Sequence, residues 1–317
     1  MDVLLVKPPS GFPTRIPHLG LGYLASALRR AGHAVSILDC PRERLDPERL
    51  LARVKQSRPG LVGLSAFSAD FPAVQSLLPR LREALPGSTL VLGGPHASCL
   101  PEHCLASLPD LDFLIAGEAE SGLPLLATRI EEGRVDPATV PGLGWRSENG
   151  IRLNDPFWDP DLDSLGLPAW DLLRLDIPEV APHGAFARQL PAAPIITTRG
   201  CPFPCTFCAA RKVSGCAIRH RSLDGVIEEV ELLAGRYGIR EIHIEDDNFT
   251  FRRDFAARFC EELLRRNLGL TWCCPTGVRL DSLDASLLSL MKRSGCYSLS
   301  LGIESGSDRI LRLMKKQ

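Results

Sequence analysis

Short apolar runs alternate with amphipathic segments over the first 135 residues of the chain. Uninterrupted apolar strands between amphipathic helices indicate a parallel sheet that is covered on both faces. We therefore expect a doubly wound α/β domain that binds its ligands at the carboxyl ends of the strands. The apolar runs predict strands at 3–9, 34–39, 61–67, 88–94 and 112–117. The segments between them predict helices at 19–32, 46–57, 71–85 and 120–133.

The pattern changes in residues 136–192 and resumes at residue 193. Asn149 and Gly150 predict the turn of a β-hairpin, and a Pro- and Asp-rich stretch follows it. We interpret 136–192 as a linker with a β-hairpin between domains 1–135 and 193–317. The second domain contains four predicted βα units. Its strands are predicted at 193–198, 240–247, 270–278 and 296–304, and its helices at 223–238, 253–267, 284–295 and 307–317.

The composition of the chain argues against several classes of protein. The chain has 317 residues, 44% of them hydrophobic and 24% charged, and a net charge of −1. The chain therefore lacks the excess of basic residues that is typical of proteins that bind nucleic acid or an anionic membrane. The sequence shows no signal peptide and no transmembrane run, so we expect a cytoplasmic protein. Its eleven cysteines are an odd number without an export signal, which favours a metal or redox site over a disulfide framework.

Three of these cysteines, Cys201, Cys205 and Cys208, follow the predicted strand 193–198 directly. Three thiolates are one ligand short of a closed metal site. One interpretation is a structural zinc site with Cys216 or His220 as fourth ligand. The other is a [4Fe–4S] cluster held through three of its irons, with the fourth iron open to a chelating molecule.

The stretch CPFPCTFC resembles the C-x₃-C-x-aromatic-C signature of the radical SAM superfamily, with Phe207 as the aromatic residue. The resemblance implies that S-adenosylmethionine (SAM) chelates the open iron and is cleaved by one electron to a 5′-deoxyadenosyl radical. HIEDDNFT (243–250) resembles the family segment that receives the SAM amino group, and LGIESGSD (301–308) resembles another that touches SAM. Taken alone, Asp246 and Asp247 are typical of a helix cap, and GIESG is typical of a turn. The implied SAM-binding residues are Phe207, Glu245, Asp246, Asp247, Gly302 and Glu304.

The first domain resembles the cobalamin-binding domain found upstream of many radical SAM domains. SAFS (65–68), GGPH (93–96) and GEAE (117–120) stand at the ends of predicted strands, on one edge of the sheet. The paired glycines permit close approach of a large ligand. The resemblance implies cobalamin contacts from Ser65, Gly93, Gly94, His96, Gly117 and Glu118.

The D-x-H-x-x-G motif that ligates cobalt is missing, because PPSGFPTRIPHLGLG (8–22) has His18 before Gly20 but no Asp at the required spacing. A metal-binding imidazole usually needs a partner on its other nitrogen. We therefore expect cobalamin to bind without a protein histidine and with its own base displaced. His18 and His96 are outside candidates for the axial ligand.

The resemblance implies a cobalamin-dependent radical SAM enzyme, either a methyltransferase acting on an unactivated carbon or an oxidative cyclase like the anaerobic Mg-protoporphyrin ester cyclase. The alternative that is not an enzyme is a cobalamin-binding sensor or carrier whose second half is vestigial. The implied partners are a small-molecule substrate (a lipid, tetrapyrrole or other natural product) and an external one-electron donor such as flavodoxin or ferredoxin. Radical SAM barrels contain six βα units, so we expect this chain to be truncated at its carboxyl end.

Overall fold

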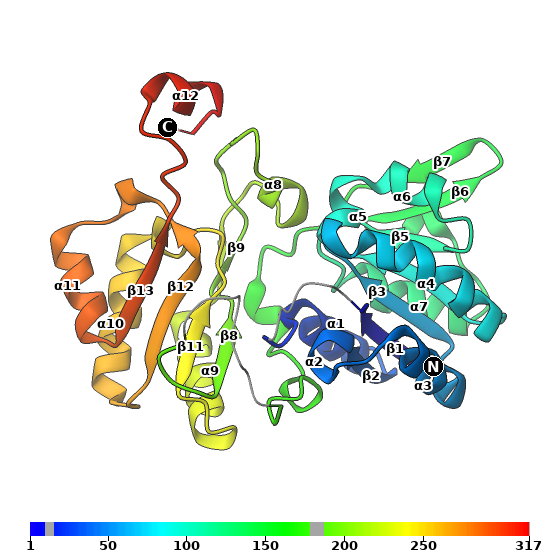
Figure 1. The fold of residues 1–317 in the computed structure, drawn as a ribbon, viewed down its shortest axis with the longest axis horizontal. Helices are drawn as coiled ribbons and strands as arrows, with labels where there is room; N and C mark the ends of the chain where they lie inside the picture. The colour runs from blue at the N-terminus through cyan, green and yellow to red at the C-terminus, as the bar shows by residue number, and fades with distance from the viewer. Residues whose placement is uncertain (10–15, 178–186, 317) are drawn as a thin grey trace. The chain divides into compact units, whose positions relative to one another are not determined.

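The computed structural model describes residues 1–9, 16–177 and 187–316, and the chain forms two compact units (Figure 1). The first unit contains residues 18–159 and 165–177 together with the amino-terminal strand. The second contains residues 160–164 and the described residues from 187 onward. Both units are α/β, in agreement with the predicted fold class.

The first unit is built on a seven-stranded sheet with the order β2-β1-β3-β4-β5-β6-β7. Strands β1 to β5 are parallel, and the hairpin β6–β7 extends the sheet by antiparallel pairing with β5. The predicted parallel sheet is therefore confirmed, and the hairpin of the expected linker is part of it. The strands are β1 (Asp2–Lys7), β2 (Ala34–Asp39), β3 (Leu61–Ser65), β4 (Thr89–Gly93), β5 (Phe113–Ile115), β6 (Leu143–Ser147) and β7 (Gly150–Leu153).

Helices cover both faces of this sheet. Alternate residues of β1 enter different cores, Leu4 and Val6 on one face and Val3 and Leu5 on the other. Burial on both faces explains why the strand is apolar without interruption. The helices are α1 (Leu19–Arg30), α2 (Cys40–Glu43), α3 (Pro47–Ser57), α4 (Phe71–Ala84), α5 (Pro95–Cys99), α6 (Pro101–Ser107) and α7 (Gly122–Glu131).

The strand order places a topological switch point between β1 and β3. The chain passes from β1 to β2 on one side and returns to β3 on the other side of β1. In open α/β sheets, ligands bind outside the carboxyl ends of the strands at such a point. Lys7 ends β1 and Ser65 ends β3, so these residues mark the expected crevice.

The second unit contains a four-stranded, fully parallel sheet with the order β13-β12-β11-β8. Its strands are β8 (Ala192–Ile195), β11 (Glu241–Ile244), β12 (Thr271–Val278) and β13 (Cys296–Leu301). A short antiparallel pair, β9 (Thr198–Arg199) and β10 (Arg219–His220), borders the cysteine-containing loop. The helices are α8 (Ala210–Val213), α9 (Leu223–Arg236), α10 (Arg253–Arg266), α11 (Ala285–Arg293) and α12 (Asp308–Leu313).

Aromatic rings fill the core of the second unit. Phe249, Phe259 and Trp272 meet edge to face, with ring centroids 5.5 to 5.7 Å apart. Edge-to-face packing is a favourable geometry for aromatic pairs. This cluster packs the middle of α10 and the turn that follows β11 against β12.

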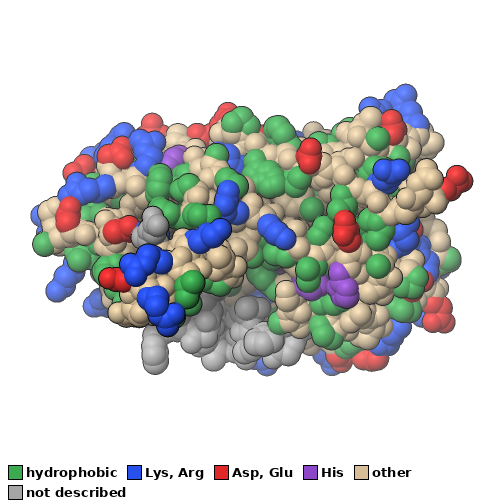
Figure 2. Space-filling view, turned by 90° about the horizontal axis from the view of Figure 1, so that it is seen from above, with side chains coloured by type: hydrophobic (Ala, Val, Ile, Leu, Met, Phe, Trp, Pro, Cys, Tyr) green, Lys and Arg blue, Asp and Glu red, His purple; other side chains and the backbone are tan. Residues whose placement is uncertain are grey.

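Acidic and basic side chains are interspersed over the face of the molecule shown in Figure 2. Among the described residues, no helix combines the length and the apolar character needed to cross a bilayer.

Candidate cofactor sites

The three predicted cluster ligands lie in the loop that follows β9. Cys201 and Cys205 are half-buried, and Cys208 is exposed. The loop is tightened where Cys208 N donates to the carbonyl of Cys205 at 3.2 Å, and Ala210 N donates to Cys208 Sγ at 3.4 Å. Burial raises the pKa of the Cys201 thiol, and nearby Asp247, Cys208 and Cys205 raise it further. Three sulfurs that influence one another in one loop form a donor set that fits an iron–sulfur cluster.

The returning chain holds the first part of this loop in place. Gly200 has a φ of +93°, and a Cβ atom there would overlap the carbonyl oxygen of Ala217. Cys201 N donates to the carbonyl of Gly215 at 3.1 Å, and the Arg219 guanidinium donates to the carbonyl of Ser214 at 2.7 Å. The position of Cys201 is thus set by contacts within the protein.

Asp246, one of the three predicted acceptors of the SAM amino group, is buried and holds the end of β8. Its carboxylate accepts hydrogen bonds from Thr197 N at 2.6 Å, from the Thr197 hydroxyl, and from the Thr198 hydroxyl at 2.9 Å. Burial raises the pKa of Asp246 to about 6, although these hydrogen bonds oppose the rise. In this structure the carboxylate is therefore used to position the strand that leads into the cysteines.

Asp247 holds the cysteine loop itself. The Asp247 side chain is exposed, but partial desolvation of its carboxyl group raises its pKa, against hydrogen bonds from the Ser214 hydroxyl and Gly200 N and the charge of Arg219. Glu245, the third predicted acceptor, is half-buried, and its backbone N donates to the carbonyl of Ile195 at 2.9 Å. Two of the three predicted acceptors thus brace the backbone around the cluster loop.

The segment after β13 lies close to the cluster loop within the second unit. The Lys316 ammonium pairs with Glu304 at 2.9 Å and lies 5.8 Å from the centroid of the Phe207 ring. Thr206 N donates to the carbonyl of Met314 at 3.0 Å. Phe207 is 54% exposed, and Glu304 has a left-handed backbone with a φ of +59°. The structure therefore brings Phe207, Gly302 and Glu304 into one region.

The two fourth ligands considered for a zinc site have other neighbours. The Cys216 thiol is exposed and accepts a hydrogen bond from Arg211 Nε at 3.1 Å. The His220 ring packs against Phe255 with centroids 5.7 Å apart, and burial lowers its pKa. These contacts favour the three-ligand interpretation of the loop.

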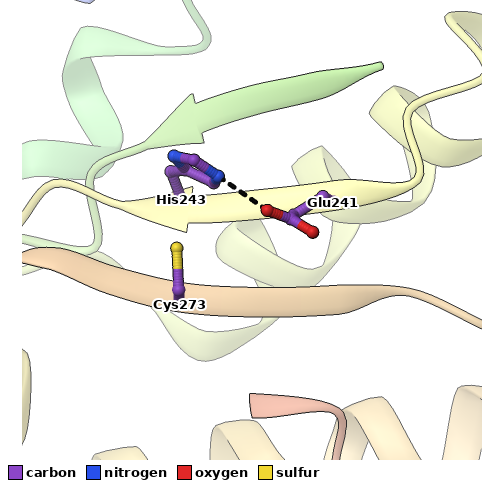
Figure 3. A group of neighbouring side chains, drawn as sticks. All are labelled: Glu241, His243 and Cys273. Carbon is purple, nitrogen blue, oxygen red and sulfur yellow. Dashed lines mark hydrogen bonds and ion pairs between the residues drawn. The ribbon is translucent and has the colours of Figure 1, made fainter. Parts of the chain in front are cut away.

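A second group of potential metal ligands, which the sequence patterns did not predict, consists of Glu241, His243 and Cys273 (Figure 3). All three are buried, and their ligand atoms lie within 4.8 Å of one another. In Figure 3 the His243 ring points to the Glu241 carboxylate, and Cys273 approaches from the neighbouring strand β12. The signal in the sequence was the polar Glu-x-His inside an otherwise apolar strand.

Hydrogen bonds already occupy the Glu241 carboxylate. Its donors are His243 Nε2 at 2.9 Å, the Tyr297 hydroxyl at 2.7 Å, the Thr271 hydroxyl at 2.7 Å, Arg188 N at 3.0 Å and Gln189 N at 2.8 Å. Burial alone would raise the pKa of Glu241, but these donors lower it to about 2. Five donors exceed the four lone-pair directions of a carboxylate. We therefore interpret this group as a hydrogen-bond centre at the amino ends of the strands.

In the first unit, the residues around the switch point contact one another. The Ser65 hydroxyl lies 3.2 Å from His18 Nε2, while His18 Nδ1 accepts from Leu21 N at 3.3 Å and caps α1. Burial and the charge of Lys7 lower the pKa of His18 to about 4. Both ring nitrogens have protein partners, which agrees with the expectation that His18 is not a cobalt ligand.

The paired glycines after β4 serve different purposes. At Gly94, whose φ is +91°, a Cβ atom would lie 2.8 Å from Ser65 Oγ and 2.9 Å from Ala66 N. Glycine is needed there by the protein's own packing. At Gly93 the nearest atom to such a Cβ is the Ile115 carbonyl oxygen at 3.7 Å, so the protein's own packing does not exclude a side chain there.

His96 follows these glycines and is buried. Its Nδ1 lies 2.9 Å from the Ser68 hydroxyl, and its Nε2 has no hydrogen-bond partner in the described part of the chain. A buried ring nitrogen without a partner fits a residue that contacts a bound ligand. Gly117 has a φ of +77°, and its N donates to Ser98 Oγ at 2.9 Å, while the next residue, Glu118, is half-buried.

Three residues near the end of β3 were also not predicted from the sequence: Lys7, Phe67 and Asp70. Lys7 and Asp70 form a buried ion pair, and the Lys7 ammonium lies 4.7 Å from the centroid of the Phe67 ring. Phe67 is half-exposed although it is a large apolar side chain. An exposed aromatic ring at the switch point fits a large flat ligand such as cobalamin.

Comparison with known proteins identifies both halves of the chain. Residues 11–127 match the B12 binding domain, and residues 195–317 match the radical SAM superfamily. An uncharacterized methyltransferase of Pyrococcus horikoshii, PH0819, is 32% identical over 100% of this chain and 68% of its own length. Cytidylyl-2-hydroxyethylphosphonate methyltransferase of Streptomyces wedmorensis is 32% identical over 94% of this chain. The anaerobic magnesium-protoporphyrin IX monomethyl ester cyclase of Rubrivivax gelatinosus is 28% identical over 95% of it.

The chain spans 63% of the Streptomyces relative and 54% of the Rubrivivax relative. Among solved structures, the radical SAM methyltransferase TsrM from Kitasatospora setae, with tryptophan and a SAM analog bound, has a TM-score of 0.79. The match covers 98% of this chain and 60% of TsrM at 24% identity, which supports the fold. The domain matches agree with the predicted cofactors, cobalamin, a [4Fe–4S] cluster and SAM.

Proposed function

Because the chain belongs to the family of B12-binding radical SAM proteins, we propose that it is part of a cobalamin-dependent methyltransferase that acts on an unactivated carbon. The observation that carries this proposal is the presence, in one chain, of a braced three-cysteine loop and a doubly wound sheet with a topological switch point. Two relatives at 32% identity bear the name methyltransferase.

When bound, the cluster and SAM supply radical chemistry at a C–H bond, and cobalamin supplies a methyl group to the resulting carbon centre. In the second unit, Cys201, Cys205 and Cys208 hold the cluster. Asp246 and Asp247 keep the cysteine loop in position through Thr197 and Gly200. Phe207, Gly302 and Glu304 border the face on which SAM binds.

In the first unit, Ser65, Gly93, Gly94 and His96 would contact cobalamin at the carboxyl ends of β3 and β4. Gly117 and Glu118 stand at the end of the next strand, at the same edge of the sheet. Both nitrogens of His18 are engaged within the protein, so cobalamin would bind here without using His18. The described residues supply no electron, so an external one-electron donor of the flavodoxin or ferredoxin class completes the system.

The substrate is a small molecule, and the chemistry of its class stays a prediction: a lipid, a tetrapyrrole or another natural product. A second function, oxidative cyclisation without methyl transfer, is favoured by the cyclase relative that covers 95% of the chain. A third candidate function is that of a cobalamin carrier whose second unit is vestigial.

One experiment separates these functions. The chain is reconstituted anaerobically with iron, sulfide and hydroxocobalamin, and is then given SAM labelled in its methyl group and a chemical reductant. Transfer of the label to the cobalamin pool together with deoxyadenosine formation is expected of the methyltransferase. Deoxyadenosine without label transfer indicates the cyclase type, and a chain that binds cobalamin but no iron indicates the carrier.

A further inference from the structure

Arg279, at the end of β12, lies on the ring of Phe203 in the cluster loop. Its Cζ atom is 3.9 Å from the centroid of that ring, and its side chain is 14% exposed. A guanidinium group this close to an aromatic face is attracted to the ring, and more strongly when it is partly desolvated. Phe203 stands between Cys201 and Cys205 in the sequence. A residue from a distant strand end therefore holds the part of the loop between these two ligands.

Two further contacts fix this arrangement. Arg279 Nε and Nη2 donate to the two oxygens of the Asp281 carboxylate at 3.0 and 2.6 Å, and this two-point contact sets the plane of the guanidinium group. The Phe251 ring, from the turn after β11, packs edge to face against Phe203 with centroids 6.1 Å apart. Phe203 is thus held by groups that follow β11 and β12 and do not belong to the cluster loop.

Phe203 in turn contacts a cluster ligand through its backbone. Its N–H donates to the Cys201 sulfur, and this hydrogen bond opposes the rise in the pKa of Cys201 that burial causes. Hydrogen bonds to the sulfurs and nearby charges both set the reduction potential of an iron–sulfur cluster. The contacts therefore run from Arg279 through Phe203 to a sulfur that binds the cluster.

A cation at this position suits the redox step. One electron from the external donor adds negative charge to a site that three thiolates already make anionic. Asp247 acts against this step, since its negative charge also raises the pKa of the Cys201 thiol. The Arg279 guanidinium offsets that charge. Its own partner Asp281 is 63% exposed, so water screens the carboxylate more than it screens the guanidinium group.

We propose that Arg279 is a positioning residue for the cluster: its guanidinium group, stacked on Phe203, holds the Phe203 N–H on the Cys201 sulfur and raises the reduction potential. This inference rests on the proposed function, because it needs the cluster to be bound. The sequence patterns did not single out Arg279. Without its guanidinium group the cluster accepts the electron less readily, and SAM cleavage then needs a stronger reductant.

The test measures the reduction potential of the full chain after anaerobic reconstitution. Wild type and Arg279→Gln are titrated with reductant, and the electron paramagnetic resonance signal of the reduced cluster reports the reduced fraction. We expect equal iron in the two proteins. At the wild-type midpoint, the ratio of reduced to oxidised cluster should fall about threefold or more in Arg279→Gln. Arg279→Lys keeps the positive charge but loses the planar group, so it should recover part of this loss.

Two controls make the result specific. Arg252 also pairs with the aspartate two positions later, Asp254, but both of these side chains are at least half exposed. Arg252→Gln should therefore leave the potential unchanged. The double variant Arg279→Gln/Asp281→Asn removes both members of the ion pair and has the net charge of wild type. It should keep the more negative potential, because the guanidinium group on Phe203 is still missing.

The outcomes separate this inference from its premise. If wild type takes up no iron, the proposed function fails. If wild type forms the cluster and Arg279→Gln has the same potential, only this inference is overturned. Loss of iron from both Arg279→Gln and Arg279→Lys would assign Arg279 a structural role and also overturn it. If only Arg279→Gln loses iron, the potential of Arg279→Lys decides: a more negative value supports the inference, and the wild-type value overturns it. An equal shift in Arg252→Gln would show that surface charge in general sets the potential, which overturns it too.

Discussion

Gly200 and Ala217 approach so closely that no side chain fits between them, because a Cβ atom on Gly200 would overlap the carbonyl oxygen of Ala217. The φ of +93° at Gly200 adds strain for any other residue. We expect Gly200→Ala to displace Cys201 and to lower bound iron from about four atoms per chain to less than about one after anaerobic reconstitution. Iron and sulfide determination measures this.

Gly238→Ala is the matched control. Gly238 also has a positive φ, +66°, but nothing lies within 4 Å of its Cβ position. That variant should lose about 1 kcal/mol of stability and keep its iron. Equal iron content in the two variants would show that the contact with Ala217 does not position the cluster loop.

Replacing any one of Cys201, Cys205 or Cys208 by Ala should abolish the cluster, because each supplies one of three thiolates. Cys216→Ala should keep it, since the structure pairs Cys216 with Arg211. The brown absorbance of the reconstituted protein and its iron content measure both effects. Loss of metal from Cys216→Ala would establish a closed four-ligand site in place of the open one.

The two glycines after β4 should respond differently to substitution. Gly94→Ala forces a side chain against Ser65 and Ala66 at positive φ, so we expect a loss of about 2–4 kcal/mol in stability. The protein's own packing does not exclude a side chain at Gly93, so in Gly93→Val the fold should remain stable while affinity for hydroxocobalamin falls about tenfold or more. Urea unfolding and spectral titration of the full chain separate the two effects. Tight cobalamin binding by Gly93→Val would move the ligand away from this strand end.

His18→Ala tests the coordination of cobalt. Because His18 Nδ1 caps α1 and Nε2 contacts Ser65, its removal should cost about 1 kcal/mol of stability. The absorption spectrum of bound cobalamin should remain that of the base-off form. A spectral change on this substitution, absent from His103→Ala, would identify His18 as the axial ligand.

Glu241 should make the second unit sensitive to acid. Its folded-state pKa is lowered from 4.5 to about 2, so its stabilisation is fully present above about pH 4.5 and is lost as the pH falls towards 2. The shift corresponds to about 3 kcal/mol. We expect Glu241→Gln to be less stable than wild type by about this amount near neutral pH, with the gap closing as the pH falls through this range.

Urea unfolding at several pH values measures that gap. The control is Asp254→Asn, which removes an exposed ion pair with Arg252 and should have little effect on stability. A difference between wild type and Glu241→Gln that does not change with pH would show that Glu241 does not titrate as its hydrogen bonds indicate.

Local chemistry made much of the fold predictable. The helix predicted at 46–57 is α3 in the structure, and the Asp46 carboxylate caps it by accepting from Arg49 N at 2.8 Å. Asn149 and Gly150 predicted the hairpin between β6 and β7. The apolar strands predicted a sheet buried on both faces, since that pattern depends only on where each side chain points.

Partners distant in sequence were not predictable. Nothing local to Asp246 shows that it will hold Thr197, 49 residues earlier, instead of facing the open surface. In the same way, an alternation pattern does not show that β6 pairs with β5, or that Glu241 is paired with Tyr297. Spacing identified the cluster ligands because their chemistry is local to one loop, whereas the residues that brace the loop depend on tertiary contacts.

The Glu241 carboxylate also has a consequence for how the strands align. Its five donors come from three strands and from the segment before β8, so they converge only when every strand has its native register. A shift of β13 by one residue would turn Tyr297 to the opposite face and leave a buried charge with fewer donors. Removing one partner of a buried charge lowers stability far more than losing an apolar contact does. One ionised side chain therefore selects a single strand alignment among several that the apolar residues alone would tolerate.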